Sequence, residues 1–165
     1  MDISVILIEI VVMLLAFTVL VFGMLFISPL TFISDYPPEI QAEYYRSQHR
    51  EASKEKLTKL MIVKKLIAVV VFLFLFAWML HLAGAKTFWQ GVGLSWGYML
   101  CVFAWDTFFL DWVLFANIKR IRLPGTEHME KAYHQKWFHV KVCLPVLPFA
   151  ILAGFISSGL MLWIW

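Results

Sequence analysis

The feature that most constrains this chain is a series of apolar runs, each about as long as a bilayer is thick. The first extends from residue 3 to residue 33 and is broken only by Glu9 and punctuated by Pro29. About 20 apolar residues cross a bilayer as a helix, so this run is long enough to cross and project beyond it. No Lys or Arg precedes the run and no small-residue cleavage site follows it, so we expect a retained span and not a signal peptide.

Three further runs have the same character, and the composition agrees with them. The chain is 62% hydrophobic over 165 residues, whereas soluble domains are about 45–50% apolar. We therefore predict an all-α membrane protein with four transmembrane helices in a single domain, residues 1–165, and no soluble domain. The predicted spans are about 3–30, 62–83, 92–115 and 138–163.

Proline and threonine positions indicate local structure around and within the spans. Pro38 suits the first position of a helix, so a helix is expected to begin there with Glu39 in its first turn. Pro145 and Pro148 predict a kink in the last span. In the second polar segment, Thr126 after Pro124-Gly125 is the expected N-cap of another helix.

The basic residues separate two long polar segments from the other connection. The segment from residue 34 to 56, with the helix edge that follows it, carries seven Lys and Arg: Arg46, Arg50, Lys54, Lys56, Lys59, Lys64 and Lys65. The segment from 116 to 136 and its edge carry six: Lys119, Arg120, Arg122, Lys131, Lys136 and Lys141. The connection after the second span has only Lys86. The positive-inside rule then predicts two helical cytoplasmic segments and both termini outside.

Two carboxylates in the third span are the main candidates for a site. An acid at the centre of a membrane helix costs about 2.5–3.5 kcal/mol on insertion scales, so it usually has a partner or a function. Asp111 is expected near the depth of His139 and Lys141, and either side chain could pair with it. Asp106 is expected deeper, where its candidate partners are a hydroxyl of Thr18 or Thr107, a water, or its own proton.

The spacing of these acids argues against a shared-proton pair. Residues five apart on an α-helix differ by about 140° in direction and about 7.5 Å in height. The α-helical expectation is therefore that Asp106 and Asp111 point to different sides. For Asp111 a structural ion pair and a functional role both stay open, and for Asp106 we favour a functional role.

Other acidic positions have a simpler interpretation beside the functional one. Glu9 could be an interfacial acid reaching outward to water, or a proton or cation site. Glu127, Glu130 and His134 share a helix face and could hold a metal, but helix capping and solvation explain the two acids without one. The sequence contains no Glu-x-x-His, no His-x-x-x-His and no Cys-x-x-Cys, so common di-iron, zincin and redox patterns are absent.

Four short motifs carry a family resemblance. They are Asp35-Tyr36-Pro37-Pro38-Glu39-Ile40-Gln41, Asp111-Trp112, Pro124-Gly125-Thr126-Glu127 and Phe138-His139-x-Lys141. Together they resemble a group of small, uncharacterised bacterial four-span membrane proteins. The resemblance implies a bacterial cytoplasmic membrane and places the matching residues at one cytoplasmic rim, but it brings no activity. His128 and Val142 stand where that group has glycine, so the local backbone is expected to differ there.

Three functions fit these observations. The first is binding or transport of a small solute, proton or ion in an ionisable pocket that faces the cytoplasm. Its candidate residues are Asp106, Asp111, Glu127, His139 and Lys141. The second is a membrane enzyme acting on a lipid-soluble substrate, with His139 as acid/base and Asp111 orienting it. The third is an accessory subunit in which the acids form ion pairs between helices.

The sequence also bears on partners. Basic residues next to the membrane suit anionic headgroups, which accounts for them without nucleic acid. Four spans are few for a pathway, so we expect a homo-oligomer or a membrane partner if the protein transports its ligand. Whether the protein uses a cofactor is left open by the sequence.

Overall fold

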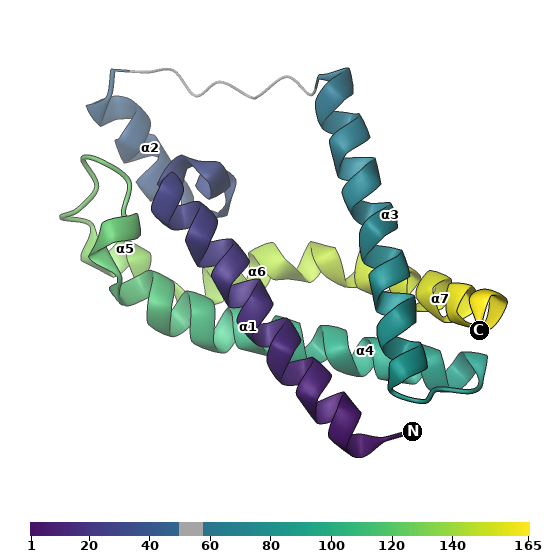
Figure 1. Cartoon of the computed structure of the whole chain (residues 1–165). Helices are drawn as coiled ribbons and strands as arrows, with labels where there is room; N and C mark the ends of the chain where they lie inside the picture. Colours follow the sequence, from purple (N-terminus) through teal and green to yellow (C-terminus); the bar gives the residue numbers. More distant parts are fainter. Residues whose placement is uncertain (50–57) are drawn as a thin grey trace. The chain divides into compact units, whose positions relative to one another are not determined.

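A computed structural model describes residues 1–49 and 58–165, and throughout these two ranges its regular structure is helical (Figure 1). The elements in chain order are α1 (Ile3–Ile27), η1 (Pro29–Asp35), α2 (Pro38–Ser47), α3 (Lys59–Leu82), α4 (Phe88–Trp105), η2 (Asp106–Phe115), η3 (Lys119–Ile121), α5 (Glu130–Tyr133), α6 (Lys136–Cys143), η4 (Leu144–Val146) and α7 (Leu147–Ile164). Four helical stretches are long and apolar enough to cross a membrane: Ile3–Ile27, Lys59–Leu82, Phe88–Phe115 and Lys136–Ile164. Over the described residues, the prediction of an all-helical structure with four such helices is confirmed.

Prolines set several of the helix boundaries. The first helix ends at Ile27, earlier than predicted, and Ser28 is extended with φ −155° and ψ 111°. A residue before proline is disfavoured in the helical region, which explains why the chain leaves the helix ahead of Pro29. Pro38 begins α2 as predicted, with Glu39 in the first turn. The predicted kink in the last span is a 3₁₀ turn, Leu144–Val146, between α6 and α7.

The chain forms two compact units, each described here by itself. Unit 1 comprises residues 1–13, 55–101 and 146–165, and unit 2 comprises residues 14–54 and 102–145. In unit 1, α3 packs against α7 (Figure 1), and the Ser157 hydroxyl donates to the Leu73 carbonyl at 3.2 Å. The buried core of unit 1 contains Phe76, Leu80, Tyr98 and Met161.

Unit 1 also buries an acid. Glu9 is only 8% exposed, and its carboxylate accepts a hydrogen bond from the Tyr98 hydroxyl. The second oxygen of Glu9 has no hydrogen-bond partner within residues 1–49 and 58–165. The interpretation of Glu9 as an acid reaching outward to water is therefore wrong, because its side chain packs inward against α4.

In unit 2, residues 29–49 and 119–135 pack together into what we call the polar cap. Tyr36 and Tyr133 are buried at its centre with their rings edge to face. The Tyr36 hydroxyl donates to the Ile121 carbonyl at 2.7 Å, and the Tyr133 hydroxyl accepts from the Leu123 amide at 3.0 Å. Burial raises the pKa of both phenols above the ordinary value, so both stay neutral at physiological pH.

The polar cap departs from the predicted capping at Thr126. We expected a helix to begin there, but α5 begins at Glu130. The Thr126 hydroxyl instead lies 2.7 Å from both the Leu123 carbonyl and the Tyr133 hydroxyl. The prediction was wrong because the threonine hydroxyl bonds to the buried hydroxyl of Tyr133, a contact that a local capping pattern does not include.

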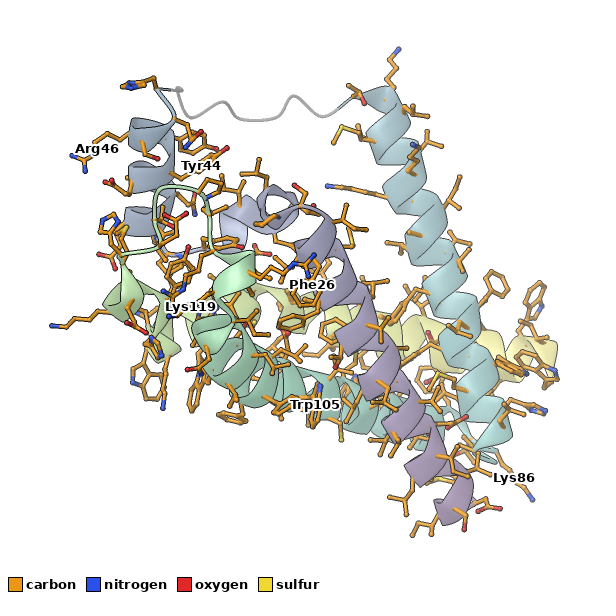
Figure 2. The ribbon with its side chains drawn as sticks, turned by 60° about the vertical axis from the view of Figure 1, so that its left-hand side comes forward. Phe26, Tyr44, Arg46, Lys86, Trp105 and Lys119 are labelled. Carbon is orange, nitrogen blue, oxygen red and sulfur yellow. The ribbon has the colours of Figure 1, made fainter. Side chains whose placement is uncertain are left out.

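Part of the first polar segment cannot be compared with its prediction. Arg50, Lys54 and Lys56, three of its seven basic residues, lie outside the described residues. Of those described, Arg46 on α2 forms an ion pair with Glu43 at 2.6 Å. Figure 2 shows Arg46 and Tyr44 on α2 and Lys119 at the start of η3, all in the polar cap.

Candidate cation site in unit 2

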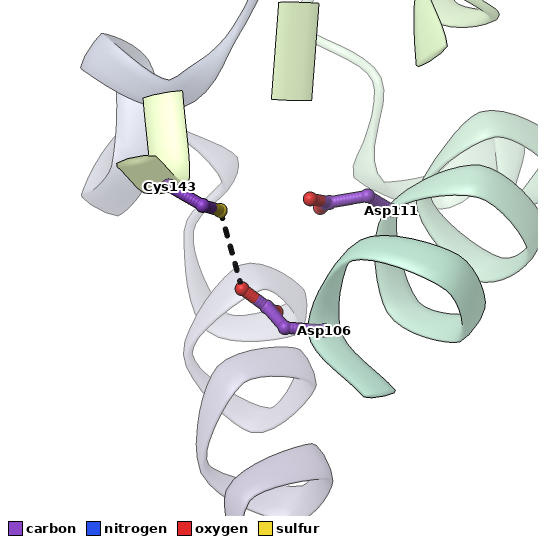
Figure 3. Close-up of side chains that lie close together, drawn as sticks. All are labelled: Asp106, Asp111 and Cys143. Atoms are coloured by element: carbon purple, nitrogen blue, oxygen red, sulfur yellow. Dashed lines mark hydrogen bonds between the residues drawn. The ribbon is translucent and has the colours of Figure 1, made fainter. Parts of the chain in front are cut away.

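The two acids of the third span lie on a π-helix. The segment Asp106–Phe115 continues α4 but changes to π-helical hydrogen bonding. In a π-helix each bond joins residues i and i+5, so residues five apart lie about one turn apart. Asp106 and Asp111 therefore face the same side (Figure 3). The expectation that they point about 140° apart was wrong, because it assumed α-helical geometry.

A third side chain completes this group. The nearest ligand atoms of Asp106, Asp111 and Cys143 all lie within 4.8 Å of one another. The Cys143 thiol donates to Asp106 Oδ2 at 3.7 Å (Figure 3). The group combines two acids from η2 with a thiol from the last residue of α6.

Neither predicted hydroxyl partner of Asp106 takes that role. The Thr18 hydroxyl accepts a hydrogen bond from Trp105 Nε1 at 2.9 Å and donates to the Leu14 carbonyl at 2.8 Å. The Thr107 hydroxyl is buried, and no described residue forms a hydrogen bond with it. The partner of Asp106 among the described side chains is the thiol of Cys143.

His139 contacts Asp111, which is one of the two pairings that the sequence predicted for this acid. Its Nδ1 lies 3.5 Å from Asp111 Oδ2. The imidazole side chain is 6% exposed, whereas that of Asp111 is 20% exposed. The other ring nitrogen, Nε2, is buried and has no hydrogen-bond partner in the described part of the chain. The ring also packs edge to face against Phe115, so its orientation is fixed by packing as well as by the acid.

These side chains border a cavity of about 260 Å³ within unit 2. Most of its wall is apolar, from α1, η2 and α6, and Tyr36 of the polar cap also borders it. The ionisable and thiol side chains lining it are Asp35, Asp106, Asp111, Tyr36, His139 and Cys143. Three of the six are carboxylic acids, and within residues 1–49 and 58–165 no Lys or Arg lines the cavity. The cavity is therefore suited to a positively charged or proton-carrying occupant.

The other predicted site residues lie elsewhere. Lys141 is exposed and does not line the cavity. Glu127 accepts from the Gly125 amide at 3.0 Å, and its backbone carbonyl accepts from Arg122 at 3.0 Å. The structure thus unites Asp106, Asp111 and His139 but not Glu127 or Lys141.

The predicted metal arrangement of Glu127, Glu130 and His134 does not form among the described residues. Glu130 lies 3.7 Å from the Arg122 guanidinium, and His134 Nδ1 lies 2.8 Å from the Glu130 carbonyl. Over residues 1–49 and 58–165, the group of three close ligand atoms is Asp106, Asp111 and Cys143, and not Glu127, Glu130 and His134.

Sequence reasoning missed three of the six ionisable or thiol side chains that line the cavity: Asp35, Tyr36 and Cys143. A signal existed for Cys143, because it follows His139 by four residues and such positions share a helix face. Asp35 and Tyr36 belong to a motif that we had placed at a cytoplasmic rim, but no periodicity linked them to the third span.

Comparison with protein-family models, with curated proteins and with solved structures finds no match for this chain.

Proposed function

We propose that this chain is an integral membrane protein that binds a small cation, proton or cationic solute in the cavity of unit 2, and that it transports this ligand. The observation that carries the proposal is the lining of the cavity by Asp35, Asp106 and Asp111, with no Lys or Arg among the described residues that line it. Carboxylates within a membrane segment need a partner, and a mobile cation is the partner that this lining leaves room for.

The cavity is proposed to open toward the cytoplasm. The support is the positive-inside rule, which places the segments around α2 and η3 inside and both termini outside. The exposed residues Lys119 and Arg120 next to the third span would meet anionic headgroups there. We further propose a homo-oligomer or a membrane partner, since four spans leave little room for a pathway.

Reconstitution of the purified protein into liposomes tests this function. An imposed potential would drive proton or potassium entry, read by a dye inside the liposomes. Wild-type protein should raise the flux above that of empty liposomes, and Asp106→Asn should abolish the increase. Asp2→Asn is the matched control, because Asp2 accepts from the Ser4 amide at the start of α1 and asparagine caps helices equally well. Equal flux through Asp106→Asn and wild type would overturn the proposal.

One observation favours a membrane enzyme as the second candidate. Asp111 lies 3.5 Å from His139, and a carboxylate beside an imidazole can orient it for general acid/base work. In that case His139→Ala would abolish turnover of a lipid-soluble substrate, such as a quinone or phospholipid, while leaving the cation flux of the protein unchanged. Loss of flux together with turnover would instead support one cation site.

A further inference from the structure

We infer that the cluster of Asp106, Asp111 and Cys143 is a binding site for a divalent transition-metal ion of the Zn²⁺ class. In this site the three side chains are ligands and His139 positions Asp111. The inference rests on the proposed function, because it names the class of cation that the cavity takes. It goes beyond that function, since a proton or potassium site needs no thiol.

The spacing of the ligand atoms fits such an ion. Zinc bonds of about 2.0–2.3 Å in a tetrahedron place neighbouring ligand atoms about 3.3–3.7 Å apart. Cys143 Sγ lies 3.7 Å from Asp106 Oδ2, and all three ligand atoms lie within 4.8 Å of one another. A contraction of about 1.5 Å at most would bring the group to bonding geometry.

The ligand types decide which class of metal fits best. Mg²⁺ and Ca²⁺ prefer oxygen ligands alone, whereas a thiolate selects softer ions such as zinc. Two carboxylates and one thiolate would leave a tetrahedral ion with one open position, as in zinc sites that exchange water or substrate. On binding, a metal–sulfur bond forms, the S–H bond breaks and the proton is released to solution.

His139 supplies an independent observation that points to a ligand. Its side chain is 94% buried, being 6% exposed, and it lines the same cavity. Nδ1 faces Asp111 at 3.5 Å, and Nε2 has no hydrogen-bond partner among the residues that the structure describes. Metal-bound carboxylates are themselves usually hydrogen-bonded by outer partners, and loss of such a partner costs about 10–100-fold in metal affinity. His139 occupies the position of such an outer partner for the carboxylate of Asp111.

The test is a titration of the full-length protein in detergent with Zn²⁺ by calorimetry and with Co²⁺ by absorption. We expect one metal per chain and a thiolate-to-cobalt charge-transfer band. Cys143→Ser should remove the band, and Asp106→Asn should weaken Zn²⁺ binding by at least the ~10–100-fold that an outer partner contributes. His139→Gln should weaken binding while keeping the band. Cys101→Ser is the matched control, since Cys101 is the other free cysteine in a spanning helix, and it should leave both signals unchanged.

The outcomes separate this inference from the proposed function. If wild-type protein with native circular dichroism binds no Zn²⁺, or if Cys143→Ser binds it unchanged, the metal site is wrong. Proton or potassium flux that still depends on Asp106 would then leave the proposed function standing. Stoichiometric Zn²⁺ binding without any such flux would support the site and reject proton or potassium transport.

Discussion

Asp106 and Asp111 present their carboxylates to one side of the same helix although five residues separate them, and their nearest ligand atoms lie within 4.8 Å. The π-helical hydrogen bonding of Asp106–Phe115 produces this register. Long π segments are rare, and single π turns are frequent at functional sites. Two acids held together this way repel each other when both are ionised and no cation lies between them.

The first prediction follows from that repulsion. Two full charges at this separation interact by about 3.5 kcal/mol at an effective dielectric constant of 20. At a pH high enough to ionise both acids, we expect Asp106→Asn to stabilise the cation-free protein by up to about 3 kcal/mol, since asparagine removes one charge. Thermal unfolding in detergent measures this gain in stability, with a chelator present to keep the protein free of metal ions.

Asp35→Asn serves as the comparison for that measurement, because Asp35 also lines the cavity but is exposed. Its effect should be small, as for most surface positions. A lower unfolding midpoint for Asp106→Asn than for wild type would contradict the repulsion argument.

The second prediction concerns the phenols of the polar cap at alkaline pH. Burial raises the pKa of Tyr36 and Tyr133 in the folded state. The stability that their neutral forms contribute is fully present below the unfolded-state pKa of about 10, and it is lost as pH rises through the folded-state pKa. We expect the free energy of unfolding to fall above about pH 10.

Substitution separates these two phenols from other alkaline effects. The Tyr36→Phe variant should lose about 0.5–1.5 kcal/mol at neutral pH with its hydrogen bond to Ile121, yet show a shallower alkaline decline. Tyr45→Phe, at a half-buried position of the same segment, should keep the wild-type slope. Denaturant unfolding at a series of pH values checks both, and identical slopes for wild type and Tyr36→Phe would refute this account.

The third prediction concerns Gly125 in the polar cap. Its φ is +83°, and an added Cβ would collide with the Ser47 hydroxyl. The left-handed backbone costs a residue with a side chain roughly 1–2 kcal/mol, and the collision adds to that cost. Gly125→Ala should therefore destabilise by about 2 kcal/mol or more, measured as a shift in thermal midpoint. The double variant Gly125→Ala with Ser47→Gly should recover only the part of the lost stability that the collision causes.

The fourth prediction concerns the buried acid of unit 1. Tyr98→Phe removes the hydroxyl that donates to one carboxylate oxygen of Glu9. Among the described residues, neither oxygen of Glu9 would then have a hydrogen-bond donor. Hydrogen bonds between membrane helices contribute on average about 0.6 kcal/mol and at most about 1.7 kcal/mol, so a loss within this range is expected. Unfolding in mild detergent measures it. Tyr98→Phe made in a Glu9→Leu background should cost clearly less, and an equal cost in both backgrounds would show that the bond contributes nothing.

Local sequence was sufficient for the helical framework. The lengths of the apolar runs predicted four helices that could cross a membrane, because an apolar run of about 20 residues must satisfy its own backbone hydrogen bonds in lipid. Proline geometry predicted the start of α2 at Pro38 and the interruption at Leu144–Val146. Depth counting indicated that Asp111 could reach either His139 or Lys141.

Tertiary structure alone decided which side chains form the site. Hydrogen bonding between residues i and i+5 in place of i and i+4 turned Asp111 toward Asp106. No residue type in that segment predicts this change from α-helix to π-helix. Cys143, Asp35 and Tyr36 reach the cavity through packing between segments distant in the sequence, and Lys141 is left exposed for the same reason. Hydropathy and proline act within a few residues, whereas helix register and cavity lining depend on the neighbours that a helix meets after folding.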